Sequence, residues 1–144
     1  MGTYLAKARR GRVRWNLVDA EGWVLGRLAA RASLVLTGKA YPDHTPNVEH
    51  RDGLIIINAD KVRLTGRKLD QKMYRHHTGY PGGLREMAAR RLQATKPELM
   101  VVEAIRGMLP KNRLGDRLAK RLKVYSGSTH PHAAQNPESL SFER

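Results

Sequence analysis

Cysteine is absent from this chain of 144 residues, and long apolar segments are absent as well. Without cysteine there can be no disulfide, no thiolate zinc cluster and no cysteine nucleophile, which removes several classes of enzyme and zinc module. The longest aliphatic run is LIII at 54–57, whereas a membrane-spanning helix needs about 20 apolar residues. The first residues also lack a signal-peptide core and a myristoylation motif. We therefore expect a cytoplasmic protein with no membrane partner.

Acidic residues are scarce: 13 Asp and Glu stand against 27 Lys and Arg, which gives a formal net charge of +14. Such an excess raises the local concentration of phosphates and indicates an anionic partner. The basic residues gather in three clusters, within residues 1–14, 61–91 and 106–123. A single basic run is usually no more than a solvated surface. Three clusters on one acid-poor chain instead favour a nucleic acid as the partner.

Length and composition predict one domain with an extension at each end. Residues 1–14 hold too little apolar surface to offset the entropy of ordering, so we expect a basic N-terminal arm that orders on a partner. Residues 15–127 are expected to form a single α/β domain that binds RNA. Residues 128–144 are polar, and we expect them to form an extended C-terminal tail.

Apolar runs predict the strands of this domain. WNLVDA at 15–20 and LIIINA at 54–59 are the clearest, and the second suggests burial on both faces, as in a parallel sheet. KMYRHHT, within 72–78, predicts a weaker third strand, and KVYSG at 123–127 predicts a fourth short one. Because helical segments separate the strands, we expect an α/β fold with a small, mostly parallel sheet.

Helical spacing of apolar residues predicts the intervening helices. The first spans residues 25–36, with Gly38 as a left-handed cap. A basic helix is expected over 84–93, and another begins at Thr95, where Glu98 three residues later would complete a capping box.

The last predicted helix is strongly basic. Leu114, Leu118 and Leu122 share one face of it, while Arg117 and Arg121 lie off that face. We expect replacement of these two arginines to weaken RNA binding with little effect on folding.

Motifs for nucleotide chemistry are missing. After the first strand the glycines are Gly22 and Gly26, which does not match a dinucleotide-binding fingerprint, and no GxxxxGK[ST] loop occurs. TGKA at 37–40 lacks both the upstream glycine and the hydroxyl that would bind magnesium. We expect no cofactor and no small-molecule substrate.

The adjacent histidines His76 and His77 are the main candidates for other chemistry. Neighbouring residues point to opposite faces of a strand or about 100 degrees apart on a helix, so the pair does not fit one metal ion. His130 and His132 form an isolated HxH without a third ligand. A small nucleotide- or metal-dependent enzyme that acts on RNA through His76 or His77 remains an alternative, as does a DNA-compacting basic protein.

RNA is favoured over DNA as the partner. No recognition helix or zinc finger is evident, while basic extensions, glycine-rich turns and scattered aromatics suit irregular folded RNA. The turn HHTGYPGG at 76–83 fits this interpretation, because its glycines allow backbone amides to approach a phosphate closely.

Several long motifs resemble one family. HHTGYPGG, AIRGMLPKNRLGDRLAKRLKVYSGSTHPHAAQNP at 104–137, WNLVDAEGWVLGRLA and INADKVRLTGRK are similar to the bacterial form of the ribosomal protein L-thirteen family of the large subunit. The likeness runs from Trp15 to Pro137; KARRGRVR before it and ESLSFER after it depart from the family pattern. It implies a three-layer α/β/α domain with a four-stranded parallel sheet and no catalysis. The implied partners are large-subunit ribosomal RNA, bound early in assembly, and neighbouring ribosomal proteins.

The resemblance and the basic clusters together define the predicted RNA contacts. The resemblance implies a structural role for the GMLP turn at 107–110. The family pattern implies contacts at His76, His77, Thr78, Gly79, Lys111, Arg113, Arg117, Lys120, Arg121 and Lys123. The basic segments and the tail add Arg10, Arg12, Arg14, Lys39, Arg67, Lys68, Lys72, Arg75, His130 and His132.

Overall fold

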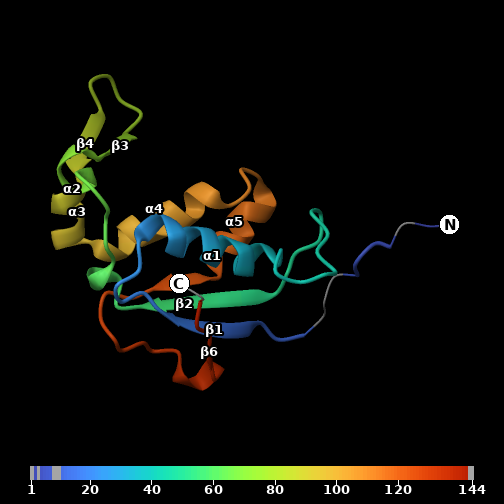
Figure 1. Ribbon diagram of the computed structural model, residues 1–144. Helices are drawn as coiled ribbons and strands as arrows, with labels where there is room; N and C mark the ends of the chain where they lie inside the picture. The colour runs from blue at the N-terminus through green and yellow to red at the C-terminus, as the bar shows by residue number, and fades with distance from the viewer. Residues whose placement is uncertain (1, 3, 8–10, 143–144) are drawn as a thin grey trace.

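A parallel four-stranded sheet forms the centre of the protein (Figure 1). The computed structural model describes residues 2, 4–7 and 11–142. In spatial order the strands are β5 (Leu122–Val124), β2 (Asp52–Ile57), β1 (Arg14–Asp19) and β6 (Glu138–Ser139). This arrangement confirms the predicted α/β fold with a small parallel sheet.

Strand β2 is buried on both faces, as its continuous apolar sequence predicts. It pairs with β1 along one edge and with β5 along the other. Leu54, Ile55 and Ile56 are all fully buried. Because successive side chains alternate across a strand, Ile55 faces the side opposite to its two neighbours.

Helices cover the face of the sheet on which Leu54 and Ile56 lie. They are α1 (Leu25–Thr37), α4 (Pro97–Met108) and α5 (Arg113–Lys120), and Figure 1 shows them together above the strands. The predicted stripe of α1 packs into this core. Gly38 ends the helix in the left-handed conformation, at φ 75°, as predicted.

The C-terminal segment covers the other face. Trp15 lies on that face beside Gly53, whose missing side chain leaves room for the indole: a Cβ there would lie 2.6 Å from the ring. His132 stacks on Trp15 with ring centroids 5.9 Å apart and planes inclined by 7°. The short helix η2 (Ala133–Gln135) follows, and β6 then pairs with the outer edge of β1. Figure 1 shows this segment beneath the sheet.

A separate antiparallel hairpin corrects two predictions. β3 (Met73–His77) does not join the parallel sheet; it pairs with β4 (Leu84–Ala88), where a helix over 84–93 was expected. Helix occupies only the end of that range, in α3 (Ala89–Thr95). The prediction was wrong because the YPGG turn folds residues 84–88 back on β3, and this pairing outweighs their helical propensity.

The start of α4 also differs from the prediction. The Thr95 hydroxyl donates to the Arg91 carbonyl oxygen, 2.8 Å away, and so belongs to the end of α3. The Glu98 carboxylate accepts a hydrogen bond from the Ser126 amide, at 3.1 Å. The expected capping box is therefore absent from this start, where both side chains serve other elements. Within the described residues, no helix is long and apolar enough to cross a membrane.

A short helix, α2 (Lys68–Gln71), and α3 connect the hairpin to the body. Tyr74 of β3 packs against the main core, and its hydroxyl is buried without a hydrogen-bond partner among the described residues. Burial, assisted by the charge of Glu103, raises the pKa of the Tyr74 phenol. The ring therefore anchors the hairpin at the cost of one unsatisfied polar group.

We expect Tyr74→Phe to raise the free energy of unfolding by about 1 kcal/mol, because it removes a buried hydroxyl that makes no hydrogen bond. A raised pKa in the folded state means that wild-type stability falls as the pH rises above the ordinary tyrosine value of 10.0. The Phe variant should lack this alkaline loss. Denaturant unfolding at neutral and alkaline pH measures both effects.

Tyr125→Phe is the matched control. The Tyr125 hydroxyl bonds to His132 Nε2 at 2.6 Å, so its removal should lower stability by about 1 kcal/mol. Equal losses in the two variants would contradict the assignment of Tyr74 as unsatisfied.

Candidate nucleic-acid interface

The β3–β4 hairpin presents the histidine pair on a projecting ribbon (Figure 1). His76 lies opposite Arg85 and His77 opposite Leu84, and all four side chains are exposed. His77 Nδ1 accepts a hydrogen bond from the Gly79 amide at 3.0 Å. A neutral His77 therefore carries its proton on Nε2, which can donate outward. Within the described residues the His76 ring makes no hydrogen bond, so both of its nitrogens can face a ligand.

The turn between α4 and α5 is fixed by three local contacts. Lys111 Nζ donates to the carbonyl oxygens of Arg106 and Gly107, both at 3.1 Å, and so closes the end of α4. Asn112 Oδ1 accepts from the Gly115 amide at 2.9 Å and caps the start of α5. Gly115 is required because the Pro110 carbonyl occupies the place of a Cβ. The GMLP turn thus sets the direction of the basic helix.

Helix α5 exposes a row of cations. Arg113, Arg117 and Lys120 are exposed, while Leu118 is buried against the core. Arg117 lies 3.9 Å from Glu49, at the limit of an ion pair, with two-thirds of its side chain exposed. A pair so open to water contributes little to stability. These charges are therefore available to an external anion.

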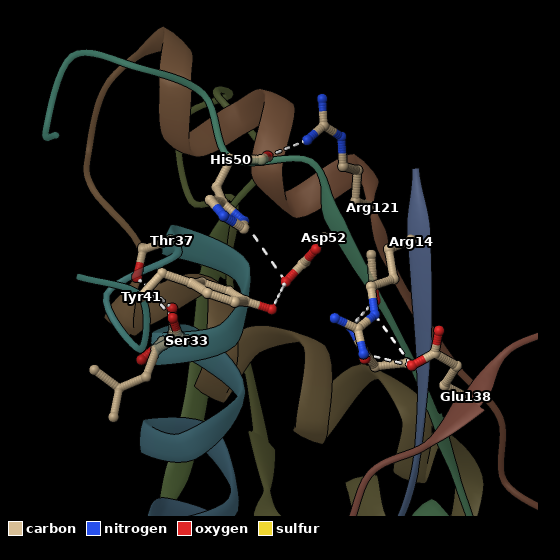
Figure 2. A network of polar contacts seen from close by, with 11 residues as sticks. Arg14, Ser33, Thr37, Tyr41, His50, Asp52, Arg121 and Glu138 are labelled. Carbon is tan, nitrogen blue, oxygen red and sulfur yellow. Dashed lines mark hydrogen bonds and ion pairs between the residues drawn. The ribbon is translucent and has the colours of Figure 1, made fainter. Parts of the chain in front are cut away.

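Arg121 has a different environment. Its guanidinium pairs with Glu49 and donates to the His50 carbonyl oxygen, and only 19% of the side chain is exposed. Figure 2 shows it reaching toward His50, whose ring stacks on Tyr41 with centroids 4.5 Å apart. The Tyr41 hydroxyl donates to Asp52 Oδ2 at 2.7 Å.

This network joins the loop at residues 38–50 to the start of β2 and the end of α5. Gly38 has room for no side chain, because a Cβ would lie 2.5 Å from the His50 ring. The expectation that replacing Arg121 has little effect on folding conflicts with these contacts. Leu122, which was expected to continue the helix, begins β5. The helix ends at Lys120, and this change of direction turns Arg121 inward.

Five other predicted contacts are partly occupied or partly buried within the protein. Arg14 pairs with Glu138, although its side chain remains 54% exposed. His132 is half-buried between Trp15 and Tyr125, and its amide donates to His130 Nδ1 at 3.2 Å. Lys123 is half-buried in β5. Arg75 forms a cross-strand ion pair with Glu86.

The remaining predicted residues are exposed on loops, on α2 or on the hairpin. Arg10 lies outside the described residues. The exposed members are Arg12, Lys39, Arg67, Lys68, Lys72, Thr78 and Gly79. The structure does not gather all of them: the hairpin stands at one end of the molecule, and the N-terminal segment leaves at the opposite end (Figure 1).

Two exposed residues of the hairpin escaped the sequence prediction. Arg85 lies directly across from His76, and Tyr80 stands at the tip with 76% of its surface exposed. The sequence pattern predicts a helix at Arg85, so its position opposite His76 on a neighbouring strand was not predicted. The signal for Tyr80 was the Pro-Gly step that follows it, since this step marks a turn and so indicates the tip of a hairpin.

Arg117 and Arg121 should differ in their contribution to the free energy of unfolding. We expect Arg121→Ala to lower the free energy of unfolding by about 2 kcal/mol, because it leaves Glu49 and the His50 carbonyl without their donor. Arg117→Ala removes an exposed charge and should change stability by less than about 0.5 kcal/mol. Thermal and denaturant unfolding measure both. Equal effects would contradict the different roles given to the two side chains.

Comparison with known proteins identifies the family of this chain. The family model described as Ribosomal protein L13 matches residues 13–131. A protein named large ribosomal subunit protein uL13 from Thermoanaerobacter sp. (strain X514) is 52% identical over 143 residues, covering 99% of this chain and 100% of the relative. The protein of that name from Pelotomaculum thermopropionicum is 57% identical over 139 residues, covering 96% of each chain. The chain belongs to the ribosomal protein L13 family.

Proposed function

We propose that the chain is a structural component of the large ribosomal subunit and binds large-subunit ribosomal RNA through the exposed cations of its hairpin, loops and helix α5. It is not an enzyme: its family is a structural part of the ribosome, and its partners are ribosomal RNA and neighbouring ribosomal proteins. Its place is the ribosome in the cytoplasm. Binding early in subunit assembly is part of the proposal.

The row of exposed charges on α5 is the observation that best supports the proposed RNA contacts. Arg113, Arg117 and Lys120 stand on a helix whose start is capped and whose opposite side is buried. A rigid support lowers the entropy lost on binding, because the backbone that carries the charges is already ordered. Fixed, exposed cations can neutralise phosphates of folded RNA, the contact that supplies most of the affinity for nucleic acid.

The proposed contacts divide into two groups according to their present partners. Exposed cations, with His76 and His77, would touch phosphates directly. Arg121, His130 and His132 already have partners within the protein and would act mainly by holding the surface in shape. We also propose that residues 1–14 form an arm that orders on RNA, that residues 15–127 form the binding domain, and that residues 128–144 form a C-terminal tail. Arg14 already belongs to β1, and the tail packs on the sheet through His132 and pairs with it through β6.

Binding should depend steeply on salt. A protein that makes six to ten phosphate contacts loses about three to five powers of ten in affinity for duplex DNA between 50 and 200 mM salt, and somewhat less per contact for single strands. We expect Arg113→Ala/Arg117→Ala to reduce the slope of log affinity against log salt by about 2, with unchanged folding. Filter binding to large-subunit ribosomal RNA across a salt series measures the slope.

Lys61→Ala/Arg90→Ala is the matched control. It removes the same charge, yet Lys61 pairs with Glu21 at 3.1 Å and Arg90 with Asp70 at 2.6 Å, away from α5. This control should leave the slope nearly unchanged. A flat response in the wild type would reject the proposed binding mode. Equal affinity for duplex DNA as competitor would instead favour a DNA-compacting protein.

A further inference from the structure

The tip of the hairpin carries an aromatic side chain that the fold does not use. Tyr80 is 76% exposed, the largest exposure among the large apolar and aromatic side chains of the described residues. The four other tyrosines differ in setting: Tyr41, Tyr74 and Tyr125 pack within the protein, and Tyr4 belongs to the N-terminal segment. A single exposed aromatic ring is not unusual on a protein surface, but on a prearranged basic loop it is free to stack on a ligand.

The backbone beneath this ring is fixed before any partner binds. The Gly83 amide donates to the Tyr80 carbonyl oxygen at 2.9 Å and closes a four-residue turn. Pro81 and Gly82, the latter with φ 70°, occupy the central positions that a type II turn requires. The Thr78 amide donates to the Gly83 carbonyl oxygen at 3.0 Å. Gly83 is packed too tightly for a side chain, since a Cβ would lie 2.7 Å from the Tyr80 carbonyl oxygen.

The surroundings of the ring are mainly basic, although Leu84 beside His77 is also 54% exposed. His76, His77 and Arg85 are exposed just behind the tip, and the Arg75 charge is already balanced by Glu86. Both faces of the two-stranded ribbon are open over most of their length. This setting attracts an anion rather than an apolar protein surface, which would leave the histidines and Arg85 desolvated without partners.

We propose that Tyr80 stacks on an unpaired base of large-subunit ribosomal RNA, while His76 and Arg85 contact the phosphates beside that base. The inference rests on the function proposed above and names a local RNA structure, a splayed or bulged nucleotide, as the target of the hairpin. Sequence-specific recognition of RNA generally uses such unstacked bases, which lie on aromatic side chains. The phenol ring supplies the stacking surface and the prearranged turn holds it in place.

Three substitutions in the full chain test the stacking. Tyr80→Ala should weaken binding to large-subunit ribosomal RNA by roughly 5- to 150-fold, the effect usual for one stacked base. Tyr80→Phe keeps the ring and should bind within about twofold of the wild type. Tyr80→Leu keeps an apolar side chain without a π face and should be as weak as the Ala variant. The salt slope should be the same in all three, because stacking neutralises no phosphate.

Ultraviolet crosslinking with mass spectrometry gives a second measurement. The wild-type complex should yield a nucleotide adduct on Tyr80, and the base that carries it should become reactive to chemical probes in the Ala variant. Wild-type affinity for Tyr80→Ala, or full binding by Tyr80→Leu, would overturn the inference. An adduct between Tyr80 and a neighbouring protein in reconstituted subunits would also overturn it.

The wild-type salt series separates this failure from failure of the proposed function. Steep salt dependence with unchanged affinity in all Tyr80 variants would reject only the stacking contact. A wild type that binds ribosomal RNA weakly and without salt dependence would reject both. Folding is not at issue in these variants, because the Tyr80 side chain is exposed and the turn is held by its backbone.

Discussion

Strand β2 pairs along both edges and is buried on both faces, and the other elements take their positions from that constraint. Leu54 and Ile56 bind the helical layer, while Ile55 faces the layer that the C-terminal segment completes. Burial of each such side chain contributes about 1.5 to 3 kcal/mol. The helical layer in turn fixes the end of α4, the turn that follows it and the direction of α5. Among the described residues the apolar core contains no cation, yet it fixes the position of α5 and therefore of the exposed cations on that helix.

Electrostatic interactions within the protein divide the basic residues into two populations. Arg121 pairs with Glu49 and both are partly buried, whereas Arg113 and Lys120 remain exposed on α5. With 13 acidic residues for 27 cations, most basic side chains cannot be paired internally. The unpaired charge repels itself in the free protein, and an RNA phosphate relieves this repulsion on binding. The same scarcity of acids that signals a nucleic-acid partner therefore also contributes to affinity.

The sequence was sufficient for the parts of the fold that follow from local pattern. The apolar run at 54–57 predicted a doubly buried strand, and helical spacing together with Gly38 predicted α1 and its end. Residues 84–88 were misassigned because strand pairing in a short exposed hairpin depends on the partner strand and the turn, not on apolar periodicity.

The proposed RNA-binding residues, like the fold, could be predicted from the sequence only in part. Charge clusters located the exposed cations, but the partners of Arg121 and His132 come from segments far away in the chain. Glu49 is 72 residues before Arg121, and Trp15 stacks on a histidine near the other end of the sequence. Long-range contacts of this kind leave no spacing pattern, so sequence alone could not separate binding cations from structural ones.

The central claim is that the hairpin and α5 contact separate segments of ribosomal RNA. Hydroxyl-radical footprinting of large-subunit ribosomal RNA tests it most directly, with the wild type, a hairpin variant (His76→Ala/Arg85→Ala) and an α5 variant (Arg113→Ala/Arg117→Ala). We predict discrete protected segments in the wild type, one lost in the hairpin variant and a different one lost in the α5 variant. Protection spread evenly along the RNA, unchanged in both variants, would contradict the account.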